Sequence, residues 1–252
     1  MPAVEQFPIE IIAHLKSCRS VTVLTGAGIS AESGVPTFRE AQSGLWARFD
    51  PLQLATPQAF HKDPQLVWDW YTWRRDLISA SKPNPGHLAL VLLEAYFQEF
   101  NLVTQNVDGM HQLAGSKQVV ELHGNIFRTR CSRIGCTTTE QTLPSASLPL
   151  CPECGSYMRP DVVWFGESLP AEALQESLQA ASSCDVFISV GTSTLIEPAA
   201  SLPFIALQAR ANVLEINPQV TPLTQEAHFS MRGKAGEVLP ALAAALMRGE
   251  GK

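Results

Sequence analysis

The sequence predicts an α/β protein built around a doubly wound parallel sheet. Two observations indicate this fold class. Short β-branched and apolar runs, each the length of one buried strand, alternate with helix-length segments of amphipathic spacing. The first run, at 21–24, enters a glycine-rich turn, and the later runs at 102–104, 119–122, 186–190 and 213–216 also end in polar or glycine turns. Because the carboxyl ends of parallel strands line a crevice in such sheets, these turns predict a ligand site.

The chain begins with a predicted helix, a strand and a glycine turn. Apolar residues recur at helical spacing over 8–17, and the strand at 21–24 follows. Gly26-Ala-Gly28-Ile-Ser-Ala31 then matches the dinucleotide-binding pattern in its Gly/Ala form, which is typical of a Rossmann-type domain. Gly26 permits a sharp turn, and Gly28, without a Cβ, would let backbone N–H groups approach a pyrophosphate. Ordinary turns also use glycine, so this pattern alone leaves the ligand open.

Residues 40–83 differ in composition and predict a helical insert over the nucleotide site. They contain several prolines and no strand-like run. Four of the chain's five tryptophans also lie here: Trp46, Trp68, Trp70 and Trp73. Core packing is the simplest role for these indoles.

Within that insert, Tyr71 and Arg74 stand three residues apart, so their side chains share one face of a helix. A phenol and a guanidinium that converge on a pocket would suit a carboxylate, which arginine binds in a bidentate fork. On the residues alone, a solvated helix face with Tyr71 half buried is the simpler interpretation. Arg75, one position round the helix, is expected to tolerate alanine with little change in ligand preference.

Polar residues follow the next predicted strand. A helix that starts at 84–87 is expected to run toward Phe100, and the strand at 102–104 then enters a polar turn. That turn contains Gln105, Asn106 and Asp108. Its place at a strand end suits the far end of a cofactor. An ordinary turn would use the same residue types, so both interpretations stand.

The run at 119–122 ends in His123, beside Gly124. A lone histidine is more often structural than catalytic. Here the imidazole stands at a strand end opposite the predicted ligand site, and its intrinsic pKa suits proton transfer near neutral pH.

Four of the six cysteines form two closely spaced pairs, Cys131-x4-Cys136 and Cys151-x2-Cys154. In a reducing compartment this spacing favours tetrahedral zinc over disulfides. No acidic residue or histidine is arranged to leave an open ligand position, so the ion is expected to be structural. A zinc loop that has kept its cysteines but binds metal poorly is the alternative. Cys18 and Cys184 are expected to be small buried hydrophobic residues.

Composition and charge limit the remaining classes. The 252 residues include 18 Lys and Arg and 24 Asp and Glu, a formal charge of −6, which argues against a general nucleic-acid binder. No apolar run approaches the roughly 18 residues of a membrane span. Residues 1–6 lack the order of a signal or transit peptide. We therefore expect a cytoplasmic monomer without membrane partners.

Residues 26–39 resemble the signature of the sirtuins, the NAD-dependent protein-lysine deacylases. The family pattern G-A-G-x-S-x-x-S-G-[IV]-P-x-F-R is met residue for residue. Most members carry Asp before the Phe, whereas this chain has Thr37, a substitution that recurs in the desuccinylase-like branch. Thr104-Gln-Asn-Val-Asp108-x-x-His111 and Leu122-His123-Gly124 also match sirtuin motifs, and the similarity extends from Val21 to about Ala235.

The resemblance implies NAD and one structural zinc ion as cofactors. We expect a Rossmann-type domain at 1–40, 84–126 and 164–252, a helical insert at 41–83 and a zinc insert at 127–163. The implied NAD-binding residues are Gly26, Ala27, Gly28, Ser30, Glu32, Thr37, Phe38, Arg39, Trp46, Gln105, Asn106, Asp108, Gly191, Thr192, Ser193, Asn217, Gln219 and Ala235. The implied zinc ligands are Cys131, Cys136, Cys151 and Cys154.

For catalysis, the resemblance implies that the acyl oxygen of a modified lysine displaces nicotinamide from NAD. His123 is then the general base for a ribose hydroxyl, and Asn106 orients the ribose and a water. Asp108 holds the nicotinamide amide, while Phe38 and Arg39 shield and order the reacting end. The products are nicotinamide, free lysine and O-acyl-ADP-ribose.

For the substrate, the Tyr71-x-x-Arg74 pair matches the mark of the sirtuin branch that removes succinyl, malonyl and glutaryl groups. Proteins with acylated lysines are therefore the expected partners. Residues 162–166 match the segment that pairs with the substrate peptide and lines the acyl-lysine tunnel. The segment consists of Val162, Val163, Trp164, Phe165 and Gly166. Alternatives on this fold are plain deacetylation and mono-ADP-ribosyl transfer; His123 and Asn106 disfavour a non-enzymatic NAD or zinc module.

Overall fold

The computed structural model describes residues 7–35, 50–141 and 147–248. Its larger sheet has six parallel strands in the order β3-β2-β1-β7-β8-β9. The strands are β1 (Ser20–Thr25), β2 (Glu99–Thr104), β3 (Val119–Glu121), β7 (Val186–Val190), β8 (Asn212–Ile216) and β9 (Phe229–Met231). Two three-strand halves meet between β1 and β7, as in a Rossmann-type sheet. The predicted fold class is confirmed.

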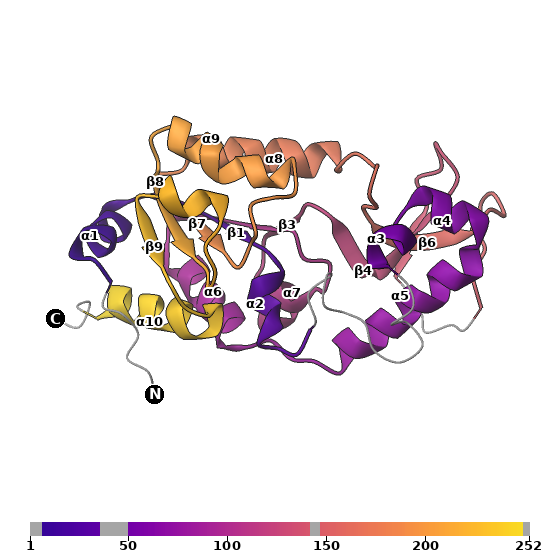
Figure 1. Ribbon diagram of the computed structural model, residues 1–252, viewed down its shortest axis with the longest axis horizontal. Coiled ribbons are helices and arrows are strands. Elements are labelled where there is room, and N and C mark those ends of the chain that lie inside the picture. Colours follow the sequence, from indigo (N-terminus) through magenta and orange to yellow (C-terminus); the bar gives the residue numbers. More distant parts are fainter. Residues whose placement is uncertain (1–6, 36–49, 142–146, 249–252) are drawn as a thin grey trace.

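Helices cover both faces of this sheet (Figure 1). One face packs against α1 (Ile9–Ser17), α6 (Pro85–Tyr96) and α10 (Ala235–Met247). The opposite face packs against α8 (Ala171–Ser183), the short η2 (Ala199–Ser201) and α9 (Leu202–Gln208). Val23 and Leu24 of β1 point into opposite cores. Every residue of β1 is therefore buried, which explains its continuous apolar and β-branched sequence.

Helix α6 is shorter than its sequence predicts. Asn84 caps it, since its Oδ1 accepts the Gly86 N–H at 2.9 Å. The helix ends at Tyr96 instead of running on toward Phe100, because Phe97 is already extended. The Glu99 N–H donates to the Arg19 carbonyl at 3.1 Å, so pairing with the chain before β1 starts β2 earlier than predicted.

The smaller part of the fold contains the predicted helices together with an antiparallel sheet that was not predicted (Figure 1). Its strand order is β5-β4-β6, with β4 (Gly124–Cys131), β5 (Thr139–Gln141) and β6 (Met158–Val162). The helices are α3 (Pro51–Leu54), α4 (Pro57–Lys62) and α5 (Pro64–Ser79). One apolar cluster joins α5 to β4 and β6. Trp68 and Trp70 are fully buried, which confirms core packing for these two indoles.

Gly124 makes the turn from β3 into β4 feasible. Its φ is +78°, and a Cβ there would collide with the main-chain carbonyl of Asp161 in β6. Only glycine fits this position, which directs the chain from the large sheet into the small one directly after His123.

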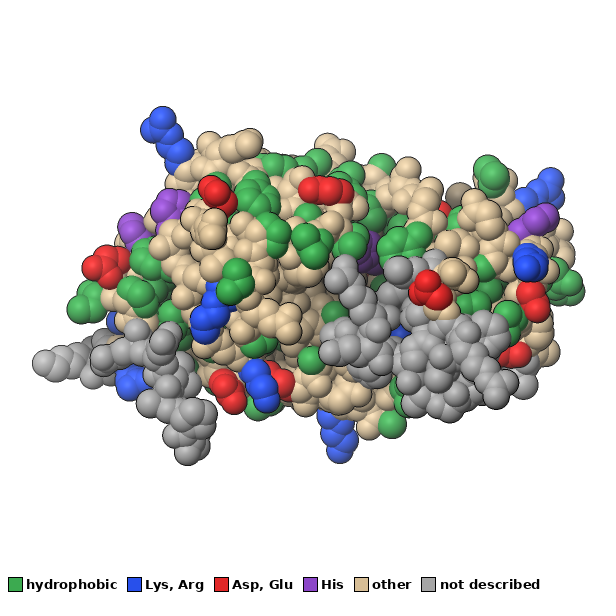
Figure 2. All heavy atoms as spheres, in the orientation of Figure 1, with side chains coloured by type: hydrophobic (Ala, Val, Ile, Leu, Met, Phe, Trp, Pro, Cys, Tyr) green, Lys and Arg blue, Asp and Glu red, His purple; other side chains and the backbone are tan. Residues whose placement is uncertain are grey.

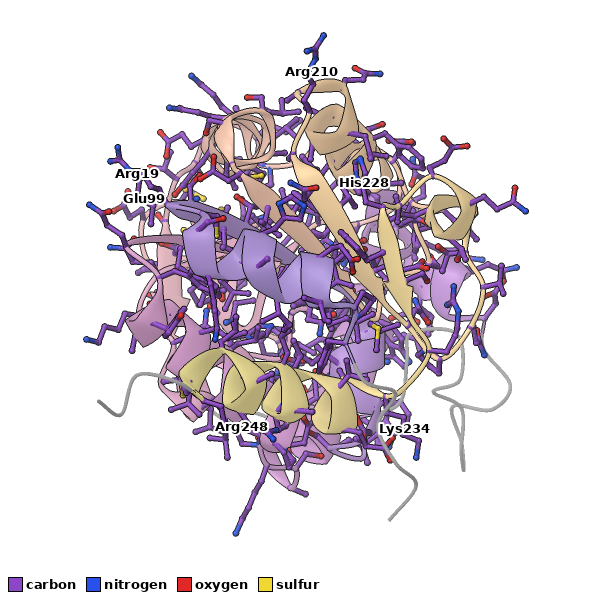
Figure 3. The ribbon with its side chains drawn as sticks, turned by 90° about the vertical axis from the view of Figure 1, so that its left-hand side faces the viewer. Arg19, Glu99, Arg210, His228, Lys234 and Arg248 are labelled. Atoms are coloured by element: carbon purple, nitrogen blue, oxygen red, sulfur yellow. The ribbon has the colours of Figure 1, made fainter. Side chains whose placement is uncertain are left out.

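Charged side chains of both signs are scattered over the face drawn in Figure 2. Figure 3 shows Arg19 and Glu99 together near the amino ends of β1 and β2, where they form an exposed ion pair of 3.6 Å. Lys234 and Arg248 mark the two ends of α10 in the same view. No helix within the described ranges is long and apolar enough to cross a membrane.

Candidate active site

The turns after β1 and β7 pack against each other at the point where the strand order reverses. The Gly26 N–H donates to the Val190 carbonyl at 3.0 Å, and the Gly28 N–H donates to the Gly191 carbonyl at 2.8 Å. A Cβ on Gly28 would lie 2.7 Å from the Gly191 Cα, and one on Gly191 would lie 2.6 Å from the Ile29 nitrogen. The Gly28 N–H is thus committed within the chain. Close contact between the two turns is what requires glycine, a reason the sequence alone did not supply.

A buried polar network joins the end of β2 to α2 (Ala27–Ala31). Ser30 donates its hydroxyl proton to Asp108 Oδ2 at 2.7 Å, and Asn106 Nδ2 donates to Ser30 Oγ at 3.2 Å and to the Gly26 carbonyl at 3.1 Å. Asp108 Oδ1 accepts the Met110 N–H at 2.9 Å. Burial raises the pKa of the Asp108 carboxyl, while these hydrogen bonds oppose the rise. The network brings together three residues that the sequence separates by up to 78 positions.

His87 supports that network, a role that was not predicted from the sequence. Its Nδ1 accepts the Asn84 N–H at 3.3 Å, so the neutral ring carries its proton on Nε2, which lies 3.4 Å from Ser30 Oγ. Burial lowers the pKa of this imidazole to about 4, so it is neutral at pH 7. The Asn-Pro-x-His pattern at a helix start is the sequence signal for this arrangement, because it forms a capping box.

A second neutral histidine supports the backbone of the same turn. His111 Nε2 lies 2.9 Å from Thr25 Oγ1, which contacts Thr104 Oγ1 at 2.8 Å. Thr104 Oγ1 accepts the Asn106 N–H at 3.0 Å. Burial lowers the pKa of His111 to about 3, and the nearby His87 adds to the effect. These hydrogen bonds fix the turn that contains Asn106.

His123 is held in the tautomer that a base requires. Its Nδ1 lies 2.8 Å from the Gln105 carbonyl oxygen, which can only accept, so Nδ1 carries the proton and Nε2 is left as an acceptor. Burial lowers the pKa of the imidazole, and the bond to Gln105 opposes that change. The Gln105 side chain donates to Thr192 Oγ1 at 2.8 Å, which ties the end of β2 to the turn after β7.

The ends of β7 and β8 meet on the other side of the glycine turns. Asn217 Nδ2 donates to the Thr192 carbonyl at 2.8 Å, and Asn217 Oδ1 accepts the Gln219 N–H at 3.1 Å. Ser193 and Gln219 are exposed beside them. The structure thus gathers Gly26, Gly191, Thr192, Ser193, Asn217 and Gln219 at one edge of the sheet.

Two further expected residues lie at the start of α10. The Glu32 carboxylate accepts the Gly236 N–H at 2.7 Å, next to buried Ala235. This places a negative charge at the amino end of the helix, where it is stabilising. Ala27 is exposed at the start of α2. Thr37, Phe38, Arg39 and Trp46 lie outside the described residues.

A buried carboxylate that the sequence analysis missed shapes the loop after β8. Glu215 is 1% exposed and accepts hydrogen bonds from Thr221, Thr224 at 2.7 Å, Ser230 at 2.9 Å and Arg232 Nη2 at 3.0 Å. Arg232 Nη1 also donates to the carbonyl oxygens of Asn217, at 3.0 Å, and Gln219. An acidic residue in an apolar strand was the available signal, because a buried charge needs partners.

Tyr71 and Arg74 are both buried on α5, so the solvated helix face is wrong. Tyr71 is 3% exposed and Arg74 is 8% exposed. The Tyr71 hydroxyl accepts the Trp164 Nε1–H at 2.9 Å. Burial raises the pKa of Tyr71 to about 12, so the phenol keeps its proton. Burial lowers the pKa of Arg74, and the nearby Asp108 carboxylate opposes that change.

Arg75, the neighbour of Arg74, is also buried on α5. It is 7% exposed, its guanidinium carbon lies 4.6 Å from the Trp68 ring centroid, and its Nη2 donates to Thr72 Oγ1 at 2.7 Å. Because the fold encloses α5 on more than one side, Arg75 is buried as well as Arg74. Replacing Arg75 with alanine would remove packing as well as charge.

The predicted substrate segment is bonded to its own chain through consecutive N–H groups. Val163 donates to the His123 carbonyl at 2.9 Å, and Phe165 donates to the Ala55 carbonyl at 2.9 Å. Trp164 donates to Glu167 Oε2 at 2.8 Å. The Phe165 side chain is 42% exposed, whereas Val162 and Trp164 are buried. Gly166 follows with a φ of +88°.

The four paired cysteines converge on one point. Their Sγ atoms all lie within 4.8 Å of one another, with Cys131 and Cys154 at 3.5 Å and Cys136 and Cys151 at 3.8 Å. A tetrahedral zinc site with Zn–S bonds of about 2.3 Å has sulfur–sulfur edges of roughly 3.8 Å. The donor set therefore fits a closed structural zinc site. Cys184 is buried and Cys18 is half-buried, largely as expected.

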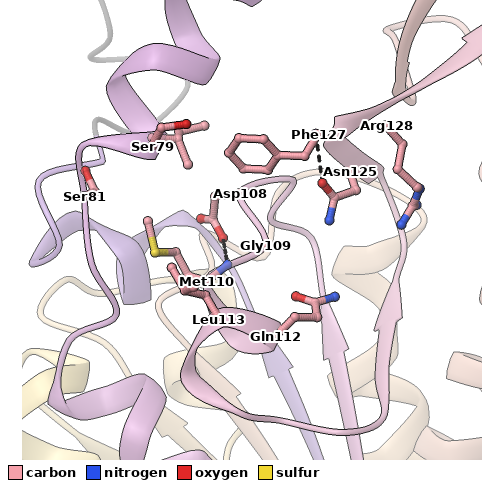
Figure 4. Close-up of a pocket in the computed structure, with 11 residues that line it drawn as sticks. Ser79, Ser81, Asp108, Gly109, Met110, Gln112, Leu113, Asn125, Phe127 and Arg128 are labelled. Atoms are coloured by element: carbon pink, nitrogen blue, oxygen red, sulfur yellow. Dashed lines mark hydrogen bonds between the residues drawn. The ribbon is translucent and has the colours of Figure 1, made fainter. Parts of the chain in front are cut away.

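A separate cavity of about 440 Å³ lies beside the turn that follows β2. Figure 4 shows it between α7 (Met110–Ala114), the end of α5 and the start of β4, with Asp108, Phe127 and Asn125 at its wall. His123 and Tyr71 are not among the described residues that line it. The cavity shares Asp108 with the hydrogen-bonded network around Ser30.

Comparisons with known proteins agree with this geometry. Residues 26–198 match the model of the Sir2 family. An NAD-dependent protein deacylase of Aquifex aeolicus is 52% identical over 217 residues, which is 86% of this chain and 90% of that protein. A crystal structure described as a Sir2 homolog–NAD complex has a TM-score of 0.89 at 44% identity and covers 96% of this chain and 94% of its own. A structure described as Sir2 bound to acetylated peptide has a TM-score of 0.83 at 29% identity, over 95% and 98% of the two chains.

The parallel sheet, the interlocked glycine turns and the comparisons together define an NAD-dependent enzyme of the Rossmann type with a four-cysteine module. The chain belongs to the Sir2 family, the sirtuins. Its close homologues are named NAD-dependent protein deacylases, so the expected enzyme class is confirmed. NAD as cofactor is confirmed as well, and the cysteine cluster fits the expected zinc ion.

Proposed function

We propose that this sirtuin removes dicarboxylic acyl groups, succinyl, malonyl or glutaryl, from lysine side chains of proteins and acts more weakly on acetyl-lysine. One observation carries the proposal: Tyr71 and Arg74 are buried together on α5. Burial raises the pKa of the phenol to about 12, so it keeps its proton, and an arginine guanidinium stays protonated at neutral pH. An acyl carboxylate that enters a buried site loses water and needs charged or hydrogen-bonding partners there. A phenol O–H and a guanidinium supply both.

Proton transfer is assigned to His123. The Gln105 carbonyl keeps the proton on Nδ1, so Nε2 accepts a proton from the reacting hydroxyl. NAD, when bound, supplies the ADP-ribose that receives the acyl group. Asn106 and Asp108, fixed by Ser30, orient groups at the reacting end, as would Phe38 and Arg39.

The remaining expected cofactor residues are proposed to hold NAD along the carboxyl edge of the sheet. The turns at Gly26 and Gly191 would receive the pyrophosphate side, and Asn217, Ser193 and Gln219 the adenosine side. Hydrogen bonds to Thr192 from Gln105 and from Asn217 support this assignment. We also propose that residues 1–40, 84–126 and 164–252 form the Rossmann-type domain, and that the protein is a cytoplasmic monomer.

The peptide is proposed to bind along residues 162–166. The N–H groups of Val163, Trp164 and Phe165 are already bonded within the chain, so the peptide is expected to use carbonyl oxygens and the exposed Phe165 side chain. The expected β-augmentation would therefore use the main-chain carbonyl oxygens of this segment and not its N–H groups.

The test compares one peptide that carries acetyl-, succinyl- or glutaryl-lysine. Arg74→Met and Tyr71→Phe are each expected to lower kcat/KM for succinyl-lysine by roughly ten- to a hundredfold, since a hydrogen bond to a charged group contributes about 1.5–3 kcal/mol. Activity on acetyl-lysine should be spared or improved. Lys62→Met, which removes an exposed charge from α4, is the matched control. An equal loss on both substrates in Arg74→Met would make the pair structural and the enzyme a plain deacetylase.

A further inference from the structure

Trp164 is held by three contacts, two of them to its indole, and is 2% exposed. Its main-chain N–H donates to Glu167 Oε2 at 2.8 Å. The Arg159 guanidinium carbon lies 3.3 Å from the ring centroid, and Nε1 donates to the Tyr71 hydroxyl at 2.9 Å. The ring cannot turn without breaking at least one of these contacts.

Arg159 and Glu167 form the support behind this ring. Arg159 is 5% exposed and binds Glu167 through two hydrogen bonds, of 2.5 and 2.8 Å. It also donates to the Val162 carbonyl at 2.8 Å. The fork therefore ties the end of β6 to the segment that contains Trp164, and the indole position is set before any substrate arrives.

The direction of the hydrogen bond to Tyr71 has a chemical consequence. An indole N–H only donates, so the phenol oxygen must be the acceptor in this pair. The proton of the phenol then points away from Trp164, toward another side of the oxygen. A tyrosine constrained in this way acts as a donor toward an acceptor such as a carboxylate.

We propose that Trp164 is a positioning residue for acyl-group selectivity: it fixes the Tyr71 hydroxyl so that the phenol donates its proton to the distal carboxylate of the acyl group. The proposal rests on the proposed function. It also replaces direct substrate contact, the expected role of Trp164, because the side chain is buried against Tyr71 and Arg159. No bond is made or broken at Trp164.

Trp164→Phe removes the N–H while leaving an aromatic ring for Arg159. The ratio of kcat/KM for succinyl-lysine to that for acetyl-lysine should fall about three- to tenfold, the range of one neutral hydrogen bond. In a Tyr71→Phe background, the same change should leave the ratio unaltered within about twofold, because the two residues act through one hydroxyl. Trp68→Phe is the matched control, since its ring stacks on Arg75.

Thermal unfolding of each variant checks that the fold is kept. If Trp164→Phe does not fold, the benzothiophene analogue of tryptophan, introduced at position 164, removes only the N–H at unchanged ring shape. The proposal is overturned if either replacement at position 164 lowers the activities on succinyl-lysine and acetyl-lysine equally. It is also overturned if the replacement lowers their ratio as much in the Tyr71→Phe background as in the parent chain. Arg74→Met separates the two proposals. If the succinyl-to-acetyl ratio falls in Arg74→Met but not in Trp164→Phe, only the proposed role of Trp164 is overturned. If the ratio changes in neither variant, both proposals are overturned.

Discussion

His123 combines a fixed tautomer with a lowered pKa. The Gln105 carbonyl accepts the Nδ1 proton at 2.8 Å, and burial disfavours the charged ring. A base whose pKa lies below its usual value is mostly unprotonated at pH 7, so its Nε2 can accept a proton. Activity that depends on this nitrogen should be flat near pH 7 and should fall once the pH drops through the lowered pKa.

We expect His123→Ala to keep NAD binding and to lose turnover by about 10²–10⁴-fold, the usual cost of removing a general base. Calorimetric titration with NAD and steady-state release of nicotinamide measure the two properties separately. His61→Ala, at an exposed histidine of α4, is the control. Deacylation within a few-fold of the parent would mean that another group accepts the proton.

The ends of β1 and β2 are joined to α6 through two uncharged imidazoles. His87 caps the helix and contacts Ser30, while His111 contacts Thr25 beside it. Their ring centroids are 5.0 Å apart, and both side chains are at most 1% exposed. Protonation of either ring would place an unbalanced charge in this interface, so these elements depend on both histidines being neutral.

Stability should therefore fall in mild acid. Unfolded histidines protonate near pH 6.5, whereas burial lowers the pKa in the folded chain to about 4 for His87 and about 3 for His111. Below pH 6.5 the unfolded state binds more protons, so the free energy of unfolding decreases as the pH drops. At about 1.4 kcal/mol per pKa unit, the pair accounts for several kcal/mol by about pH 4. The raised pKa of Asp108 acts in the opposite direction.

Urea unfolding between pH 7 and 4.5 measures this dependence. His111→Gln should flatten it, because glutamine does not titrate, and exposed His61→Gln should leave it unchanged. A urea midpoint that stays constant over this range in the parent chain would contradict the assignment of neutral buried imidazoles.

At the scale of the whole molecule, the cysteine-containing end has little apolar core of its own. The described cluster there consists of Cys131, Cys151 and Met158, with Cys136 and Cys154 packed against it. A module with so few buried side chains needs another source of folding energy, and a metal bound by four thiolates supplies it. The same strands, β4 and β6, pack against α5 through a shared core. Loss of the metal should therefore disturb the region of Tyr71 and Trp164 as well.

Elemental analysis should give about one zinc per chain. Exhaustive chelation, or the single change Cys151→Ser, should lower the melting temperature and the deacylase activity together, because such sites contribute folding energy. Cys18→Ser, outside the cluster, should leave the zinc content unchanged. A chelated protein that unfolds at the same temperature and is fully active would show that the metal is dispensable.

Features that depend on residues near one another in sequence could be predicted directly. The lengths of apolar runs, the helical spacing and the glycine turn were sufficient for the parallel sheet, since backbone conformation follows local pattern. The paired cysteines were sufficient for the metal site, because ligand spacing within two short turns restricts the geometry.

The contacts that set the chemistry join segments far apart along the chain. Trp164 and Tyr71 are separated by 93 positions, and Gln105 and Thr192 by 87. Gly28 is required by the backbone of Gly191, and Arg75 is buried because the fold encloses α5. The spacing of apolar residues along the sequence does not indicate which distant side chain will fill a given space or which donor will reach a given acceptor. Packing in three dimensions settles those contacts, because burial and hydrogen bonding act between neighbours in space.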